Sequence, residues 1–156
     1  MPMFLTLQAQ AYAKGGQIQP ALETIEQAIG ACASNGERWA EAEALRIKAA
    51  LLVQAGTAKW TGVEAILLDS LDIAQRQGAR CWQLRAACDL SRLWQRQGRN
   101  AKAIELLQSV YDEFTEGFDS EELLEARKLL LDLRRDSPRV AGKDCPKQSA
   151  GTKRKL

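Results

Sequence analysis

A short pattern that recurs three times along the chain constrains its fold more than any other feature. In each copy a bulky side chain precedes a glycine by four positions, and a small or β-branched residue follows at the start of the next segment. The copies are Tyr12, Gly16 and Ala21; then Leu52, Gly56 and Val63; then Trp94, Gly98 and Ala103. The glycines are 40 and 42 residues apart. Self-similarity at such a period is typical of a helical repeat architecture.

The third copy, from Trp94 to Phe114, is the clearest. After its glycine the apolar residues recur at intervals of three and four, at Ala103, Ile104, Leu107, Val110, Tyr111 and Phe114. This spacing predicts an amphipathic helix packed on the helix that precedes the glycine. Aromatic residues make up only 6% of the chain, whereas Ala, Leu, Gln, Glu and Arg abound. This composition favours helices, and we expect no sheet.

We therefore predict an all-α fold: a right-handed α-solenoid of three helix hairpins and a C-terminal capping helix, in residues 1–135. The hairpins are expected at about residues 3–34, 37–77 and 79–115. The capping helix is expected at 119–135, where Asp119 and Glu122 have the spacing of a capping box. Such a helix would cover the last exposed face of the array. In residues 136–156 the periodicity ends among prolines, glycines and lysines, which predicts a disordered basic tail.

Three segments of the chain resemble a known family. They read RWAEAEALRIKAALLVQAG, QRQGARCWQLRAACDLSRLWQRQGR and VYDEFTEGFDSEELLEARKLL. They are similar to the C-terminal tetratricopeptide (TPR) repeat array of bacterial class III adenylate/guanylate cyclase proteins that also contain an AAA-type ATPase domain. The likeness covers about residues 3–133, and its most specific parts are Trp82 to Ala87 and Thr115 to Asp119. The chain departs from the family at Ala40, Ala44 and Ala49, where the family often has Trp, His and Gly.

The resemblance implies a regulatory protein-interaction module and lends no catalytic residue to this chain. The segments that would carry cyclase or ATPase chemistry lie outside the match, and no part of the chain aligns with them. Two interpretations stay open. The chain is a stand-alone binding module, or it is the C-terminal fragment of a multidomain cyclase whose catalytic domains lie upstream.

The composition also argues against an enzyme. Histidine is absent, which removes imidazole bases, His-based metal sites and Ser-His or Cys-His pairs. The nearest approach to a phosphate-binding loop has Ser137 in place of its first glycine and Asp144 in place of its hydroxyl residue. We expect no catalytic residue, no cofactor and no metal. The four scattered cysteines favour reduced thiols in a bacterial cytoplasm, and no apolar run has the length of a membrane helix.

Cysteine and tryptophan could in principle form reactive or stacking sites. Cys81 and Cys88 are seven residues apart, which places them on one helical face about 10 Å apart, too far for a disulfide. Their alanine-rich surroundings favour a packing role. The helical positions of Trp39, Trp82 and Trp94 likewise favour the core.

Charge provides the candidate binding site. In a solenoid of this type the first helix of each hairpin lines the concave face, and the helical register selects the side chains that point there. The predicted groove residues are Gln10, Lys14, Glu43, Arg46, Gln54, Arg85, Arg92, Gln95 and Arg96. Five of them are basic and one is acidic. We therefore expect an acidic protein or peptide partner held by arginine side chains, against the alternative of an ordinary solvated surface.

The two ends of the chain suggest further contacts. Met3, Phe4 and Leu7 would be exposed on the first helix, which predicts self-association through the N-terminal hairpin, as in an oligomerising structural repeat protein. Residues 1–135 carry 16 basic and 18 acidic side chains, while residues 136–156 carry 6 and 2. The basic tail could contact nucleic acid. It contains no aromatic residue and no helix that could contact bases in a groove of nucleic acid, which favours a solubilising role instead.

Overall fold

The chain folds into a row of paired helices. The computed structural model describes residues 1–36 and 38–137. Its elements are α1 (Pro2–Lys14), α2 (Ile18–Asn35), the short 3-10 helix η1 (Arg38–Ala40), α3 (Glu41–Ala55), α4 (Trp60–Arg76), α5 (Arg80–Arg96), α6 (Asn100–Tyr111) and α7 (Glu121–Asp136). These residues contain no strand, so the all-α prediction is confirmed.

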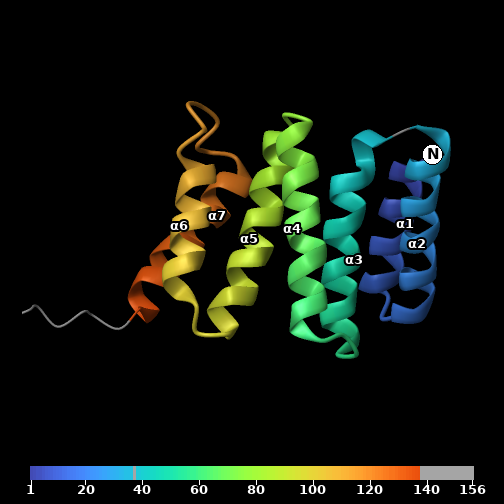
Figure 1. The fold of residues 1–156 in the computed structure, drawn as a ribbon, viewed down its shortest axis with the longest axis horizontal. Coiled ribbons are helices and arrows are strands. Elements are labelled where there is room, and N and C mark those ends of the chain that lie inside the picture. The colour runs from blue at the N-terminus through green and yellow to red at the C-terminus, as the bar shows by residue number, and fades with distance from the viewer. Residues whose placement is uncertain (37, 138–156) are drawn as a thin grey trace, which may run out of the picture.

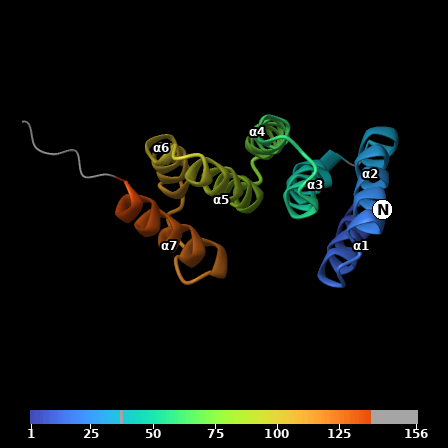
Figure 2. The same cartoon turned by 90° about the horizontal axis from the view of Figure 1, so that it is seen from below.

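The helices form two rows. Successive hairpins stand side by side along the long axis of the molecule (Figure 1). In the perpendicular view α2, α4 and α6 lie along one side, which we call the outer row, and α1, α3, α5 and α7 lie along the other, the inner row (Figure 2). Helices of the inner row also contact one another, in the pairs α1–α3, α3–α5 and α5–α7. The array therefore curves toward the inner row, as in the α-solenoid expected from the sequence.

Small side chains fill much of the space between the helices. One core cluster joins the first hairpin to α3, and its buried members are Ala9, Ala21, Ile25, Ala28, Ala44, Ile47 and Leu51. A second cluster runs from α3 to α7 and includes the fully buried Leu84, Leu90, Leu107 and Leu133. Each hairpin thus buries its apolar face against its neighbours, which is how a repeat array obtains its stability.

Glycine closes the turn that leads from each inner helix to the next outer one. After α5 the amide of Gly98 donates to the carbonyl of Gln95 at 3.0 Å, and the amide of Arg99 donates to that of Trp94 at 2.8 Å. These bonds place Gly98 at φ +72, a left-handed conformation that a Cβ atom disfavours. Gly16 and Gly56 have the same sign of φ. The recurring glycine of the sequence therefore marks a backbone requirement.

The start of α7 differs from the prediction. The helix begins at Glu121 with Ser120 at its N-cap, and no side chain caps it. A capping box on Asp119 would need the helix to begin one residue earlier, and the carboxylate of Glu122 accepts a hydrogen bond from Arg85 of α5 at 2.7 Å. The capping-box prediction was wrong because the N-cap is Ser120 rather than Asp119, which leaves Glu122 two residues after the N-cap instead of three.

The C-terminal residues are described only in part. Asp136 is the last residue of α7 and Ser137 follows it, so the first position of the predicted tail is helical. The rest of that tail, residues 138–156, lies outside the described residues. Within the described ranges, no helix combines the length and the apolar character needed to cross a bilayer.

The tryptophans divide between core and surface. Trp94 is buried in the second core cluster, as predicted. Trp39 is 52% exposed and lies in η1, before the start of α3. Its ring stacks on that of half-buried Trp82 with 6.0 Å between centroids. The core prediction was wrong for Trp39 because the residue precedes the helix whose apolar stripe it was expected to join.

The left-handed turns predict opposite effects for two glycine-to-alanine substitutions. Gly98→Ala should lower the free energy of unfolding by about 1 kcal/mol. The cost comes from the positive φ alone, because no atom lies within 4 Å of the added Cβ. Gly30 lies inside α2, and no atom lies within 4 Å of an added Cβ there either. Gly30→Ala should therefore raise the free energy of unfolding by about 0.5 to 1 kcal/mol. Urea unfolding of both variants tests this, and a stabilised Gly98→Ala protein would contradict the assigned turn.

Candidate functional site

Inner-row side chains of α3, α5 and α7 surround a hollow of about 320 Å³. We call this region the inner groove. Its lining residues are Arg46, Leu84, Arg85, Cys88, Asp89, Arg92, Glu121, Glu122 and Glu125. All but two of them are charged, so electrostatics determine what the hollow can bind.

A buried carboxylate anchors the groove. Glu43 of α3 is only 2% exposed. Arg46, one helical turn later, donates to both of its oxygens at 2.8 and 2.9 Å. Arg85 of α5 donates to it at 3.3 Å. Two guanidinium groups from different helices thus compensate the charge that burial would otherwise make costly.

The same pattern continues across the groove. Arg46 also donates to Asp89 of α5 at 2.8 Å. Asp89 accepts a second bond from Arg92 at 3.0 Å, and Arg92 in turn pairs with Glu125 of α7. The result is a continuous network that crosses three helices, in the order Glu122, Arg85, Glu43, Arg46, Asp89, Arg92 and Glu125. We call it the groove network.

The network shifts the proton affinities of its members. Burial raises the pKa of Glu43, but the hydrogen bonds and charges of Arg46 and Arg85 outweigh it, so the pKa lies below the ordinary 4.5. Burial lowers the pKa of Arg46, and Glu43 and Asp89 more than reverse this. The bond from Arg85 lowers the pKa of Glu122. All three groups are therefore charged at neutral pH.

The structure brings together four of the predicted groove residues, Glu43, Arg46, Arg85 and Arg92, in the groove network. Gln95 instead donates to Asp136 at the end of α7, at 2.9 Å. Gln10, Lys14, Gln54 and Arg96 take no part in the network; Gln10 is half-buried and the other three are exposed.

Sequence reasoning missed the acidic half of the groove. Asp89 follows Arg85 by four residues and precedes Arg92 by three, so helical spacing alone would have placed it on the same face. Glu122 and Glu125 belong to α7, which was treated only as a cap. With these acids included, three network arginines face four carboxylates. The excess of positive charge expected from the sequence is absent from the network.

A second hollow adjoins the first and is mainly apolar. It has a volume of about 160 Å³ and lies between α3 and α5, with α4 as its floor. Its lining residues are Ala49, Ala50, Val53, Val63, Leu67, Asp89, Arg92, Leu93 and Arg96. Because both hollows share Asp89 and Arg92, we treat them as one surface. It has a charged half and an apolar half, and Arg96 lies at the edge of the apolar half.

The cysteines on α5 have different environments. Cys88 is buried in the wall of the inner groove, and burial raises the pKa of its thiol to about 12. It therefore stays protonated at neutral pH and packs as a small apolar residue. Cys81 is exposed, so the predicted packing role was wrong for this residue.

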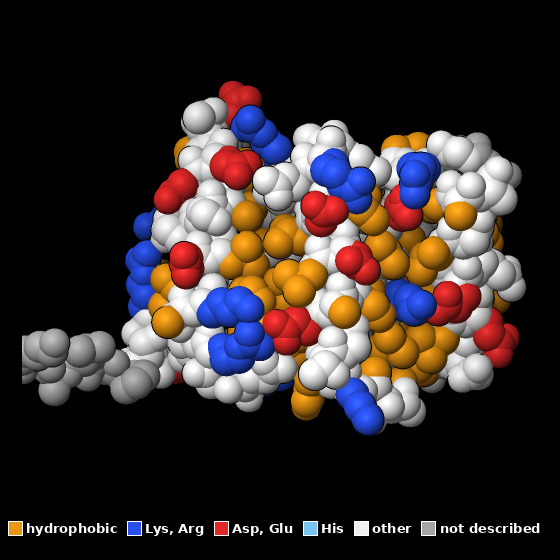
Figure 3. Space-filling model, viewed as in Figure 1, with side chains coloured by type: hydrophobic (Ala, Val, Ile, Leu, Met, Phe, Trp, Pro, Cys, Tyr) orange, Lys and Arg blue, Asp and Glu red, His pale blue; other side chains and the backbone are white. Residues whose placement is uncertain are grey.

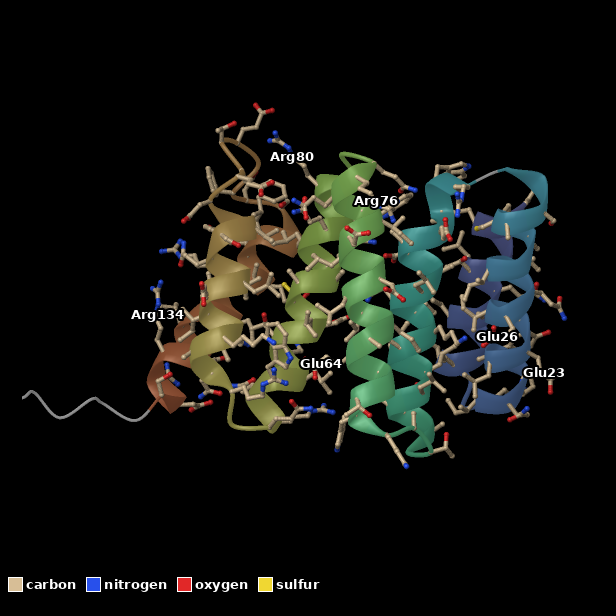
Figure 4. The ribbon with its side chains drawn as sticks, in the orientation of Figure 1. Glu23, Glu26, Glu64, Arg76, Arg80 and Arg134 are labelled. Carbon is tan, nitrogen blue, oxygen red and sulfur yellow. The ribbon has the colours of Figure 1, made fainter. Side chains whose placement is uncertain are left out.

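The outer face carries a separate polar cluster around Glu64 of α4, which Figure 4 labels. The indole of Trp94 donates to Glu64 at 2.9 Å, and Arg99 donates to it at 3.0 Å. The ammonium of Lys102 lies 4.1 Å from the centroid of the Trp94 ring. Burial raises the pKa of Glu64, but the bonds from Trp94 and Arg99 and the charge of Lys102 lower it overall. These groups satisfy one another and tie α4 to the α5–α6 turn.

Elsewhere on the outer face, acidic and basic side chains are interspersed with apolar ones (Figure 3). No large region of one charge gathers in that view. The part of the chain that the structure describes also holds no group of three or more Cys, Asp or Glu side chains placed to bind a metal ion. The inner groove is therefore the candidate site.

The buried Glu43 makes stability depend on pH. Glu43→Gln should lower the free energy of unfolding at pH 7 by about 3 kcal/mol, because two arginines lose their shared charged partner. Since the folded-state pKa of Glu43 is depressed, its stabilisation is present above pH 4.5 and is lost as pH falls through the folded pKa. The variant should therefore show a flatter stability profile in that acidic range. Unfolding curves from pH 2 to 7 measure this.

Asp72→Asn is the matched control. It removes a largely exposed ion pair with Arg76 on α4 and should cost at most about 0.5 kcal/mol. If both variants lost the same free energy of unfolding, the buried ion pairs of Glu43 would stabilise the fold no more than an exposed ion pair does.

Comparisons with known proteins agree with the fold. No family model matches the chain. A crystal structure of a Podosopora anserina kinesin light chain protein with nearly identical TPR-like repeats superposes with a TM-score of 0.69 at 20% identity, over 86% of this chain and 67% of that one. The crystal structure of a variant of the same protein superposes with a TM-score of 0.64 at 20% identity, over 86% of this chain and 65% of that one.

A sequence relative comes from Rhizobium meliloti (strain 1021), an uncharacterised protein that is 35% identical over 86 residues. The match covers 55% of this chain and only 8% of that protein. The superposition on the two solved structures, at 20% identity, shows that the chain has the fold of a TPR-like helical repeat array.

Proposed function

We propose that this array is a non-catalytic protein-interaction module that binds a peptide segment along its inner groove. The observation that carries the proposal is the pairing of two hollows on one curved surface, a charged one beside an apolar one. Recognition sites typically combine an apolar pocket, which accepts a side chain, with polar groups that orient the ligand. The predicted residues Gln10, Lys14, Gln54 and Gln95 would extend this surface along the inner row.

The contacts within the groove refine which partner fits. Arg46, Arg85 and Arg92 already bind carboxylates of the chain itself, so an acidic partner would have to displace them. Arg96 is exposed, makes no ion pair within the described residues and borders the apolar hollow. The preferred peptide therefore places an apolar side chain in that hollow and a carboxylate beside Arg96.

Selection from a random peptide display library tests this preference. Enriched peptides should carry an aliphatic or aromatic residue next to Asp or Glu. Arg96→Ala should weaken their binding about two- to fivefold through loss of the exposed charge. Ala50→Phe, at an exposed position on the edge of the apolar hollow, should weaken it more.

Arg76→Ala is the control, since this exposed arginine lies on α4 outside both hollows. Its affinity for the selected peptides should match that of the unmodified protein. If Arg96→Ala and Ala50→Phe also leave the affinity unchanged, the groove is not the binding surface.

A second candidate function is that of the C-terminal regulatory piece of a multidomain adenylate/guanylate cyclase. It rests on the resemblance of Trp82 to Ala87 and Thr115 to Asp119 to such proteins, and on the much greater length of the Rhizobium meliloti relative. If this is right, the coding region next to this chain should encode ATPase and cyclase motifs. An unrelated neighbouring region would remove this candidate.

A further inference from the structure

The arginines of the charged hollow already have partners within the chain. Each of the three guanidinium groups that line it donates to two different carboxylates. The pairs are Arg46 with Glu43 and Asp89, Arg85 with Glu43 and Glu122, and Arg92 with Asp89 and Glu125. An anionic group would therefore have to displace a bonded carboxylate before it could pair with any of these arginines.

The carboxylates on the α7 side of the hollow are less fully used. Glu43 and Asp89 each accept hydrogen bonds from two arginines. Glu122 and Glu125 each accept from only one arginine. Glu121 also lines the hollow, is exposed, and makes no ion pair within the part of the chain that the structure describes. The unfilled hydrogen-bonding capacity of the hollow is therefore that of acceptors.

The charge of the hollow points to the same kind of ligand. With buried Glu43 included, three arginines face five carboxylates, an excess of two negative charges. The acids are not placed to share a metal ion, since the described residues hold no such group of three. Glu121 and Glu125 are one helical turn apart, so they lie on the same side of α7. An ammonium or guanidinium group, which offers several N–H donors and no acceptor, matches this arrangement.

We propose that the charged hollow binds a lysine or arginine side chain of the peptide whose apolar side chain enters the apolar hollow. This inference rests on the proposed peptide-binding function and adds the charge that the partner carries. Of the two hollows, the acids of α7 line only the charged one, Arg96 lines only the apolar one, and Asp89 and Arg92 line both. The peptide therefore carries its basic and acidic residues on opposite sides of its apolar residue.

The peptides enriched by display selection provide the first test. They should carry Lys or Arg on the side of the apolar residue opposite to Asp or Glu. A synthetic copy of one such peptide, with Gln in place of the basic residue, should bind about two- to fivefold more weakly. Glu121→Gln should weaken the basic peptide by a similar factor and leave the affinity for the glutamine copy unchanged, because only the basic peptide uses this carboxylate.

Asp119→Asn is the matched control. It removes an exposed carboxylate two residues before Glu121 that does not line the charged hollow. The affinity for both peptides should stay the same, which separates a contact with Glu121 from a change in the overall charge of this region. A loss equal to that of Glu121→Gln would overturn the inference.

The results also separate this inference from the function on which it rests. If Ala50→Phe weakens binding but the selected peptides lack a basic residue, the groove binds peptides and the inference is overturned. The same holds if Glu121→Gln changes the affinity for the two peptides equally or not at all. If Ala50→Phe, Arg96→Ala and Glu121→Gln all leave the affinity unchanged, the groove is not the binding surface and both proposals fail.

Discussion

The carboxylate of Glu43 is almost fully removed from water, and the geometry of the inner row depends on how its charge is satisfied. Arg46 comes from the same helix, but Arg85 comes from the next inner helix. Arg85 reaches on to Glu122 of α7, so one buried acid fixes the separation of three helices. These ion pairs therefore add directional links between the inner helices to the apolar packing of the core.

The outer row is fixed in a different way. Around Trp94 a single aromatic ring fills the core, donates its indole proton to Glu64 and lies beneath the cations of Arg99 and Lys102. This arrangement joins α4, α5 and the following turn at one point. The recurring geometry of these turns comes from glycine, whose left-handed φ no other residue adopts as readily. The inner row is thus joined by a network of ion pairs, and the outer row by the contacts of one tryptophan ring.

The fold could be predicted from the sequence, whereas the electrostatic character of the groove could not be predicted in full. The intervals of three and four from Ala103 to Phe114, together with the recurring glycines, are local patterns, and local patterns determine helices and turns. The pairing of Arg92 with Glu125 is a tertiary contact between residues 33 positions apart, which one-helix register does not reveal. Trp39 shows a related limit at a helix start. The second hairpin is expected from residue 37, but α3 begins at Glu41, so Trp39 lies before the helix and stays largely exposed.

The matched charges of the groove network have a consequence for the speed of binding. Three arginines and four carboxylates packed within hydrogen-bond distance nearly cancel at long range, so this surface projects little electric field into the solvent. A partner would then be captured at an ordinary diffusional rate with weak dependence on ionic strength, without the acceleration that strongly charged clefts provide. Selectivity at such a surface would arise after the encounter, in the lifetime of the complex, which depends on how well an apolar side chain fits the hollow beside Arg96.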